Sequence, residues 1–459
     1  MPRRIGSLAA KAPAPKFRSA FCSASLKEWC NNRRTPNEIN FRPVGKTKGN
    51  LTIQRDLGPA PAGQPNSSDY VKALTASFLG WTLDAFDFFV LVMALPAVAK
   101  DFGTDVKAMT ATISVTLAFR PVGAFIFGLM ADRYGRRIPL MLNLVFYSVI
   151  EVLSGLAPDF KSFLILRALF GIGMGGEWGI GASLAMEKVP PKWRGVLSGV
   201  LQEGYAVGYL LAACCYYLVF PKWGWRPMFF IGGLPALLAV YVRFQVKESA
   251  VWEKTRHANW GSLGRALRSN WKIFLYLTLL MTMMNCVSHG TQDLYPTFLK
   301  LQRGFAPEQV AVIAVIYNIG ALTGGIFFGL MSDRFGRRRS MATALLGAAV
   351  MIPLWAFAPT TVLLVIGAFL IQFMVQGAWG VVPAHISELA PDSVRGFLPG
   401  FAYQCGVFIA GALPFLQADL AKKTGNYATA MSMTALTVFL LGAIVVWVGK
   451  ENKGSHFGA

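Results

Sequence analysis

Long apolar runs separated by short polar segments make up the chain from about residue 70 to residue 448. Each run is near 20 residues long, which is the length that an α-helix needs to cross a hydrocarbon core of about 30 Å. The pattern therefore predicts twelve membrane-spanning helices. They cover approximately residues 72–97, 108–130, 138–156, 161–186, 195–218, 228–245, 272–298, 308–331, 340–357, 361–386, 396–417 and 428–448.

One interior polar segment, residues 246–271, is clearly longer than the other breaks. It divides the twelve predicted helices into two sets of six. We therefore expect a first six-helix bundle over residues 70–245 and a second over residues 272–450. Residues 246–271 become a linker, and residues 451–459 a short C-terminal tail.

The first 69 residues differ in composition from the rest of the chain. They are basic and rich in Pro, Ser and Asn, and they lack an apolar helical period. This composition favours a disordered basic tail over residues 1–69. Many Arg and Ser with few acids is also typical of a transit peptide, although no amphipathic stretch is sustained.

Charge and composition exclude several classes of protein. Hydrophobic residues make up 54% of the chain and charged residues only 15%, which excludes a soluble globular domain. The net charge of +21 would otherwise suggest a nucleic-acid partner. The Lys and Arg residues of the chain, however, are concentrated in the linker and in the polar breaks after the even-numbered helices. By the positive-inside rule we expect a multi-pass protein of the plasma (bacterial inner) membrane with both termini cytoplasmic, and no nucleic-acid partner.

The two halves of the chain repeat at an offset of 201 residues. The segment from Gly128 to Arg137 reads GLMADRYGRR, and the segment from Gly329 to Arg338 reads GLMSDRFGRR. The same offset carries Glu187, Trp178-Gly179, Arg194-Gly195 and Gly199 onto Glu388, Trp379-Gly380, Arg395-Gly396 and Gly400. Two homologous bundles with a cavity between them are typical of a transporter.

The duplicated G-x-x-x-D-R-x-G-R-R break resembles the signature loop of the major facilitator superfamily. That resemblance implies an all-α membrane protein with two pseudo-symmetric six-helix bundles. The glycines let helix ends approach, and the aspartates can pair with an arginine or cap the next helix. Positive-inside anchoring alone explains the arginines but not the aspartates, so we interpret the loops as a conformational latch. Its members are Gly128, Asp132, Arg133, Arg136, Gly329, Asp333, Arg334 and Arg337.

A second, narrower resemblance lies in the seventh predicted helix. Residues 285–297 read NCVSHGTQDLYPT, similar to the N-x-x-[ST]-H-x-[ST]-Q-D-x-x-x-T motif of Jen-type lactate/pyruvate permeases in the sialate:proton symporter family. The stretches around Arg120 and Glu177 also look like that family, as does the Tyr403-Gln404 pair. The family's Asn three residues further is Val407 here. The resemblance implies proton-coupled uptake of a carboxylate, which could be a short monocarboxylate or sialic acid.

Polar side chains of the seventh helix share one face. At 100° per residue, Asn285, His289, Gln292 and Asp293 fall within a sector about 100° wide. Ionisable groups in a bilayer must face protein or water, so the stripe indicates a cavity wall. The alternative is a packed helix–helix contact held by amide hydrogen bonds. We expect His289 and Asp293 to titrate as a coupled unit.

Arg120 is the central candidate because it lies near the middle of the second helix. Its guanidinium suits a bidentate contact with a substrate carboxylate. The alternative is a permanent ion pair with Asp84, Asp87 or Asp293. The two interpretations are compatible if they describe different states of one site. The substrate carboxylate then competes with an internal acid for Arg120, and the acid that it displaces takes up a proton.

Further polar residues complete the predicted site. Arg167, near an outer boundary, is expected only to pair with one of the acids of the first half. The substrate-binding set is Arg120, Asn285, His289, Gln292, Tyr403 and Gln404. The proton-coupling set is Asp84, Asp87, Glu177, Glu203, His289 and Asp293.

The residues thus predict proton-coupled symport of a small carboxylate, such as lactate or pyruvate, by alternating access. Alternatives are a sialic acid importer, an antiporter that exports metabolites, and a membrane nutrient sensor. Bulky aromatic side chains on helices 1, 5, 7 and 11 would favour the small anion. We expect no enzyme activity and no cofactor, because the sequence has no P-loop and no metal-ligand or nucleophile pattern. The expected partners are a small organic anion, protons and lipid, with a monomer as the functional unit.

Overall fold

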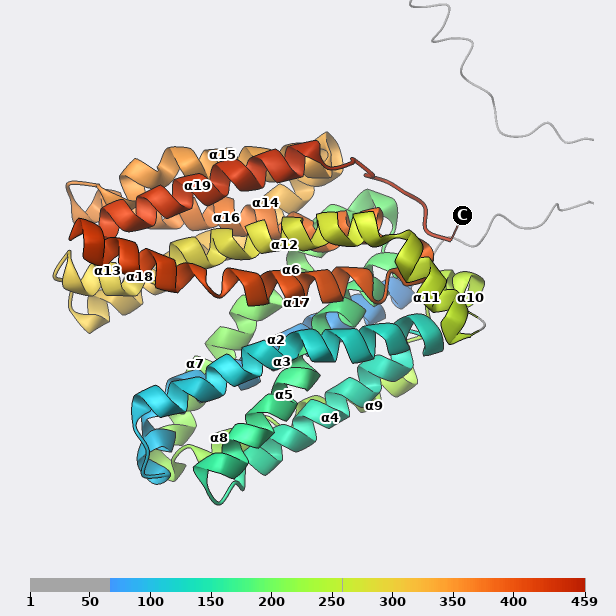
Figure 1. Cartoon of the computed structure of the whole chain (residues 1–459), viewed down its shortest axis with the longest axis horizontal. Coiled ribbons are helices and arrows are strands. Elements are labelled where there is room, and N and C mark those ends of the chain that lie inside the picture. Colours follow the sequence, from blue (N-terminus) through green and yellow to red (C-terminus); the bar gives the residue numbers. More distant parts are fainter. Residues whose placement is uncertain (1–66, 258, 459) are drawn as a thin grey trace, which may run out of the picture. The chain divides into compact units, whose positions relative to one another are not determined.

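The computed structural model describes residues 67–257 and 259–458, so nearly all of the predicted N-terminal tail lies outside the described residues. Twelve helical segments are long and apolar enough to cross a membrane, which confirms the twelve predicted spans. Figure 1 shows them as two groups of helices joined by a linker.

The first half contains α2 (Ser67–Asp101), α3 (Val106–Tyr134), α4 (Arg137–Gly155), α5 (Phe160–Lys188), α6 (Arg194–Gln202), α7 (Gly204–Trp223), α8 (Arg226–Ile231) and α9 (Pro235–Gln245). The linker holds α10 (Ala250–Thr255) and α11 (Trp260–Ser269). The second half contains α12 (Trp271–Gln292), α13 (Tyr295–Leu301), α14 (Pro307–Phe335), α15 (Arg337–Ala356), α16 (Thr361–Leu389), α17 (Leu398–Ala410), α18 (Leu413–Thr424) and α19 (Tyr427–Val448).

Four spans that the sequence predicted as continuous helices are interrupted, so that prediction is wrong for them. The breaks separate α6 from α7, α8 from α9, α12 from α13, and α17 from α18. Three of the restarting helices carry a proline in the first turn: Pro235, Pro296 and Pro414. Proline lacks the N–H that would continue the preceding helix. The break between α6 and α7 is a single residue, Glu203, followed by a glycine.

Glycines allow close helix contacts inside each half. Gly171 and Gly175 of α5 pack against the backbone of Thr116 and Arg120 on α3, where a methyl group would overlap those residues. In the second half, Gly324 of α14 packs against the Phe373 backbone on α16. Small residues permit such approaches between membrane helices. The α3–α5 contact therefore fixes the height of Arg120.

The two halves meet at the membrane face that carries α10 and α11, which we call the linker side. There α3 contacts α17 and α6 contacts α14. Gly179 of α5 packs directly against Gly400 of α17, backbone to backbone. Toward the opposite side, α7 and α8 diverge from α13 and α18 (Figure 1). The structure is thus a state closed on the linker side.

Candidate functional site

Arg120 lies between the halves with its guanidinium buried at 4% exposure. Its carbon Cζ lies 5.9 Å from the ring centre of Tyr403 on α17, a cation–π geometry. Nε and Nη2 have no hydrogen-bond partner. No ion pair joins Arg120 to any acid of residues 67–458, so the predicted alternative of a permanent pair with Asp84, Asp87 or Asp293 is wrong for this state.

Two predicted acids stand close to Arg120. Asp84 on α2 and Glu177 on α5 are fully buried, and both lie near enough to interact with the charge of Arg120. The carboxylate oxygens of both residues have no hydrogen-bond partner in the described structure. The structure therefore brings together one cation and two acids without a direct bond between them.

A third predicted acid, Asp87, belongs to a separate buried group. Arg167 forms an ion pair with Glu151 of α4 (Nη2 to Oε2, 2.6 Å) and a hydrogen bond to Ser154. The expectation that Arg167 pairs with Asp84, Asp87, Glu177 or Glu203 is therefore wrong. Glu151 was missed although it is the one acid inside the apolar run 138–156, which is the signal that could have found it. Asp87 and Glu151 both border Gly232, where α8 ends.

Arg167 is stabilised by three aromatic rings besides its ion pair. Its Cζ lies 4.5 Å from the ring centre of Phe170 and 5.4 Å from those of Phe163 and Phe229. A buried ion pair surrounded in this way is a structural element of the first half. Arg167 is therefore not a free cation for an anionic substrate.

Tyr403 belongs to a cluster of aromatic rings that come from five spans. Ring centres lie 4.4 Å away for Trp178, 5.9 Å for Trp379 and 6.4 Å for Trp81, and Trp81 stacks on Tyr205 at 5.4 Å. The indole Nε1 atoms of Trp81 and Trp379 have no hydrogen-bond partner. Bulky aromatic side chains on helices 1, 5, 7 and 11 were the feature that would favour a small anion over a larger acidic sugar. Those on the first, fifth and eleventh spans are present here, and the cluster draws its others from the fourth and tenth spans.

His289 and Asp293 form the contact that the helical spacing predicted. His289 Nδ1 lies 2.9 Å from Asp293 Oδ2, and the two side chains are 29% and 37% exposed. Asp293 interacts electrostatically with Tyr205 of α7, in the other half of the chain. The pair therefore faces the first half, where an imidazole and a carboxylate can exchange protons.

The two amides of this helix are already occupied. Asn285 Nδ2 donates to the Met281 carbonyl at 2.7 Å, and Gln292 Nε2 donates to Gln372 Oε1 of α16 at 2.9 Å. The Gln292 contact is the helix–helix hydrogen bond that was weighed as the alternative to a cavity wall. Neither amide joins the group around Arg120 in this state.

Gln404 and Glu203 occupy equivalent places in the two halves. Gln404 Nε2 donates to the Gly175 carbonyl oxygen at 3.4 Å, across the boundary between the halves, while its Oε1 has no partner. Glu203 is 8% exposed and borders Gly325 of α14. Both side chains thus lie at the boundary where the two halves contact each other.

The predicted latch aspartates contact the opposite half. Asp132 accepts hydrogen bonds from the backbone N–H of Gly396 (2.7 Å) and Phe397 (3.0 Å). Asp333 accepts from Gly195 (2.8 Å) and from the residue after it. Each aspartate also pairs with the arginine four residues on. Of the two predicted alternatives, pairing with an arginine is therefore present, and the backbone N–H groups that the aspartates accept from belong to the opposite half and not to the next helix.

The repeated Glu and Arg residues extend this network. Arg136 pairs with Glu187 at 2.9 Å, and Arg337 pairs with Glu388 at 2.9 Å. Although burial lowers the pKa of Arg136, the Glu187 and Asp132 carboxylates raise it above its ordinary value. Arg194 of the first half reaches Glu388 at 3.0 Å. The sequence showed this repetition but assigned these glutamates no role.

The remaining predicted latch residues, two arginines and two glycines, differ in whether they contact another part of the protein. Arg133 donates from Nη1 to the His257 carbonyl in the linker at 3.0 Å. Arg334 is exposed and packs against the neighbouring Phe335 ring, so its assignment to the latch is wrong for this state. Gly128 and Gly329 lie against the opposite half, at Phe397 and Gly195.

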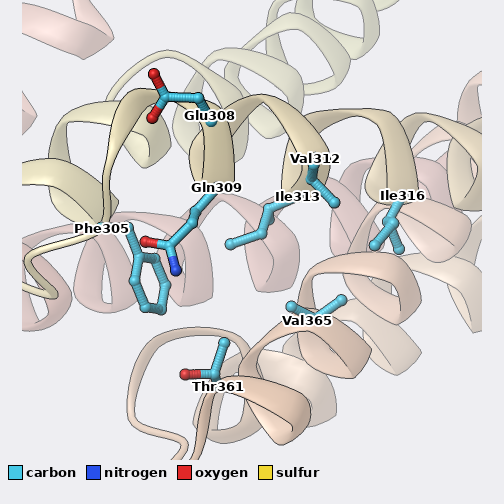
Figure 2. Close-up of a pocket in the computed structure, with 8 residues that line it drawn as sticks. All are labelled: Phe305, Glu308, Gln309, Val312, Ile313, Ile316, Thr361 and Val365. Carbon is cyan, nitrogen blue, oxygen red and sulfur yellow. The ribbon is translucent and has the colours of Figure 1, made fainter.

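The outer surface has a hollow that is separate from the residues around Arg120 and Tyr403. Figure 2 shows it between α14 and α16, with Phe305, Gln309, Val312 and Thr361 among its lining residues. Its lining is mostly apolar and includes no predicted site residue. This surface suits lipid chains better than an organic anion.

Comparisons with known proteins agree with this architecture. A family described as "Sugar (and other) transporter" matches residues 72–260, and "Major Facilitator Superfamily" matches residues 287–457. The sialic acid transporter NanX of Escherichia coli (strain K12) is 30% identical, over 84% of this chain and 95% of its own. A carboxylic acid transporter protein homolog of Saccharomyces cerevisiae is 29% identical, over 82% of this chain and 67% of its own.

A solved structure shares the fold. The proton:xylose symporter XylE, bound to 6-bromo-6-deoxy-D-glucose, superposes with a TM-score of 0.70 at 19% identity. The match covers 86% of this chain and 98% of that one. At this identity the likeness concerns the arrangement of helices alone.

Proposed function

The chain belongs to the major facilitator superfamily, and on that premise we propose that it carries a small monocarboxylate, such as lactate or pyruvate, together with protons. It is a secondary active transporter, driven by an ion gradient through alternating access. The substrate occupies the space between the halves, beside Arg120 and Tyr403. Its lipid-embedded functional unit is the single chain.

The observation that carries this proposal is the guanidinium of Arg120, which forms no ion pair with any acid of the described residues. A buried cation without a hydrogen-bonded acid is costly in a membrane unless another anion occupies the place. Two of its nitrogen atoms have no partner, which is what a bidentate contact to a carboxylate requires. The Tyr403 ring beside it limits how far the guanidinium can turn.

The aromatic cluster supports a small anion. Trp81, Trp178 and Tyr205 pack ring to ring with Tyr403 or with one another beside the guanidinium, and such bulky side chains favour a small anion over a larger acidic sugar. The names of two relatives, a carboxylic acid transporter homolog and a sialic acid transporter, share the carboxylate that Arg120 would bind. The 30% identity to NanX keeps sialic acid as the second candidate substrate.

Proton coupling follows from the acids around Arg120. Asp84 and Glu177 are buried without partners, so each is held neutral by a proton or balanced by the guanidinium. A substrate carboxylate on Arg120 removes that balance, and an acid must then take up a proton. His289 and Asp293, which are partly exposed, relay protons between water and this group.

The direction of the closed state follows from charge. The positive-inside rule places the linker side in the cytoplasm. The state described above is then closed to the cytoplasm and diverges toward the outside, as an importer does before it takes up substrate. Asp132, Asp333 and their partners form the latch of this state.

Counterflow in proteoliposomes tests the proposal. Vesicles preloaded with unlabelled lactate should take up labelled lactate, and external pyruvate should compete better than sialic acid. Arg120→Lys should lower this exchange by about tenfold or more, because lysine keeps the charge but loses the bidentate geometry. Exchange that is supported by sialic acid alone would select the second candidate. Exchange of neither acid would overturn the carboxylate assignment.

A further inference from the structure

Glu203 has an unusual position among the buried acids. It is the single residue between α6 and α7, and its side chain crosses to the other half, where Oε1 borders Gly325 of α14. The residue is 8% exposed, and Oε1 has no hydrogen-bond partner. Glu203 forms no ion pair within residues 67–458, unlike Glu151 or Glu388.

The internal repeat shows what chemistry this position requires. The offset of 201 residues maps Glu203 onto Gln404, and Gly175 onto Gln376. Gln404 donates its amide N–H to the Gly175 carbonyl oxygen across the boundary between the halves. At the equivalent place, the Gln376 carbonyl oxygen and Glu203 Oε1 both lie within 4 Å of the point where a Cβ of Gly325 would stand. A glutamine always offers a donor to such a carbonyl, whereas a glutamic acid does so only when it is protonated.

The neighbours of Glu203 offer no compensating charge. Asp84 of α2 and Glu177 of α5 lie near each other and near Arg120, whereas Glu203 has no charged neighbour of this kind among the described residues. No charged side chain in the described parts of α14 and α16 contacts it. An ionised carboxylate beside a carbonyl oxygen, without a cation, is strongly disfavoured in a membrane. The closed state therefore holds Glu203 in its acid form.

The surface that buries Glu203 is one that must open. Contacts between α6 and the second half include the Asp333 hydrogen bond to Gly195 and the Ser198 hydrogen bond to the Gly380 carbonyl at 2.7 Å. These contacts break when the linker side opens, and water then reaches Glu203. By contrast, Asp84, Asp87 and Glu177 are buried within the first half, whose internal packing a rigid-body rotation preserves.

We propose that Glu203 carries a transported proton in the state closed on the linker side and releases it when α6 and α14 separate. In the step the O–H bond of the carboxyl breaks, the proton passes to water on the linker side, and the carboxylate remains. The empty carrier then closes with the carboxylate ionised, and a proton that enters from the side opposite the linker restores the acid form against Gly325, so that each cycle moves one proton to the linker side. The inference rests on the proposed function, since it assigns the proton of that symport.

The test compares two reactions of the full-length protein in proteoliposomes. Glu203→Gln imitates the acid form permanently, so lactate counterflow at equal pH on both sides should persist. Lactate accumulation driven by an inward proton gradient should fall to the level of vesicles without a gradient. Glu308→Gln, the same change at an exposed acid of α14, is the matched control and should keep both reactions.

Each outcome bears on the inference. Gradient-driven accumulation that survives in Glu203→Gln overturns it, and so does loss of counterflow together with accumulation in a protein that folds normally. If Glu203→Gln does not fold, Glu203→Asp should retain accumulation with a shifted pH dependence, and an unshifted profile overturns the inference. A wild-type protein without any carboxylate counterflow would instead refute the proposed function, so the two failures are distinguishable.

Discussion

Arg194 in the first half forms a buried ion pair with Glu388 in the second half, with 3.0 Å between Nη1 and Oε1. Glu388 is shared, because Arg337 of its own half also binds it. Removing one partner of a buried pair leaves an uncompensated charge and costs about 3–5 kcal/mol. We expect Arg194→Gln to destabilise the state closed on the linker side.

Cysteine accessibility measures this effect. A cysteine placed at Ser183, whose hydroxyl donates to the Arg395 carbonyl across the boundary, is buried in the closed state. In the Arg194→Gln background it should react with a water-soluble maleimide at least tenfold faster than in the parent. Lys192→Gln, at an exposed basic residue two positions away, serves as the control. An unchanged rate would contradict a role for this ion pair in closure.

The C-terminal segment contributes a second contact to the same arginines. The Phe457 ring centre lies 3.9 Å from Cζ of Arg194 and 3.7 Å from Cζ of Arg395, so two guanidinium groups from different halves share one ring. Each cation–π contact is worth about 0.5–2 kcal/mol. Phe457→Ala should therefore weaken closure on the linker side by about 1–3 kcal/mol, again read as faster labelling at position 183.

His456→Ala provides the comparison for Phe457, since this neighbouring side chain is exposed. It should label at the parent rate. Equal labelling of the two variants would mean that the ring between the arginines does not hold the halves together.

Hydropathy and repetition predicted much of this molecule from its sequence. The twelve spans follow from run length, because backbone hydrogen bonds in a bilayer must be satisfied within the helix. The latch aspartates were found because the offset of 201 residues repeats them. Their partners in the opposite half were not, since a hydrogen bond to a distant backbone N–H leaves no local pattern.

Side-chain partners inside the bundles were harder to predict. Helical spacing placed His289 beside Asp293 correctly, because residues four apart share a face. It could not choose between Gln372 and a substrate as the partner of Gln292, since that depends on how α12 and α16 are rotated. The pairing of Arg167 with Glu151 depends in the same way on the contact between α4 and α5.

His289 and Asp293 should act as one unit in transport. His289 Nδ1 lies 2.9 Å from Asp293 Oδ2, so a substitution of either residue removes the same contact. We expect His289→Gln and Asp293→Asn each to flatten the pH profile of lactate uptake between pH 5.5 and 8. The double variant should be no worse than the more impaired single variant.

Initial uptake rates over that pH range measure the coupling. Gln292→Asn, on the same helix but bonded to Gln372, should lower the rate without changing the shape of the profile. Additive losses in the double variant would show that the imidazole and the carboxylate work independently.

The close backbone contact between Gly179 and Gly400 can be tested by adding a methyl group to one of the two glycines. Gly179 and Gly400 touch where the two halves meet below Trp178 and Tyr403, and a Cβ on either residue would overlap the other backbone. Gly179→Ala should therefore hold the halves apart on the linker side, so that the closed state becomes rare and uptake falls about a hundredfold or more.

Gly425→Ala is the control for Gly179→Ala. Gly425 has open space around its Cα, so an added methyl group meets no neighbour there, but its φ of +66° disfavours alanine. It should cost about 1 kcal/mol of stability and leave the uptake rate of folded protein unchanged. Normal uptake by Gly179→Ala would mean that the contact with Gly400 is not required in the transport cycle.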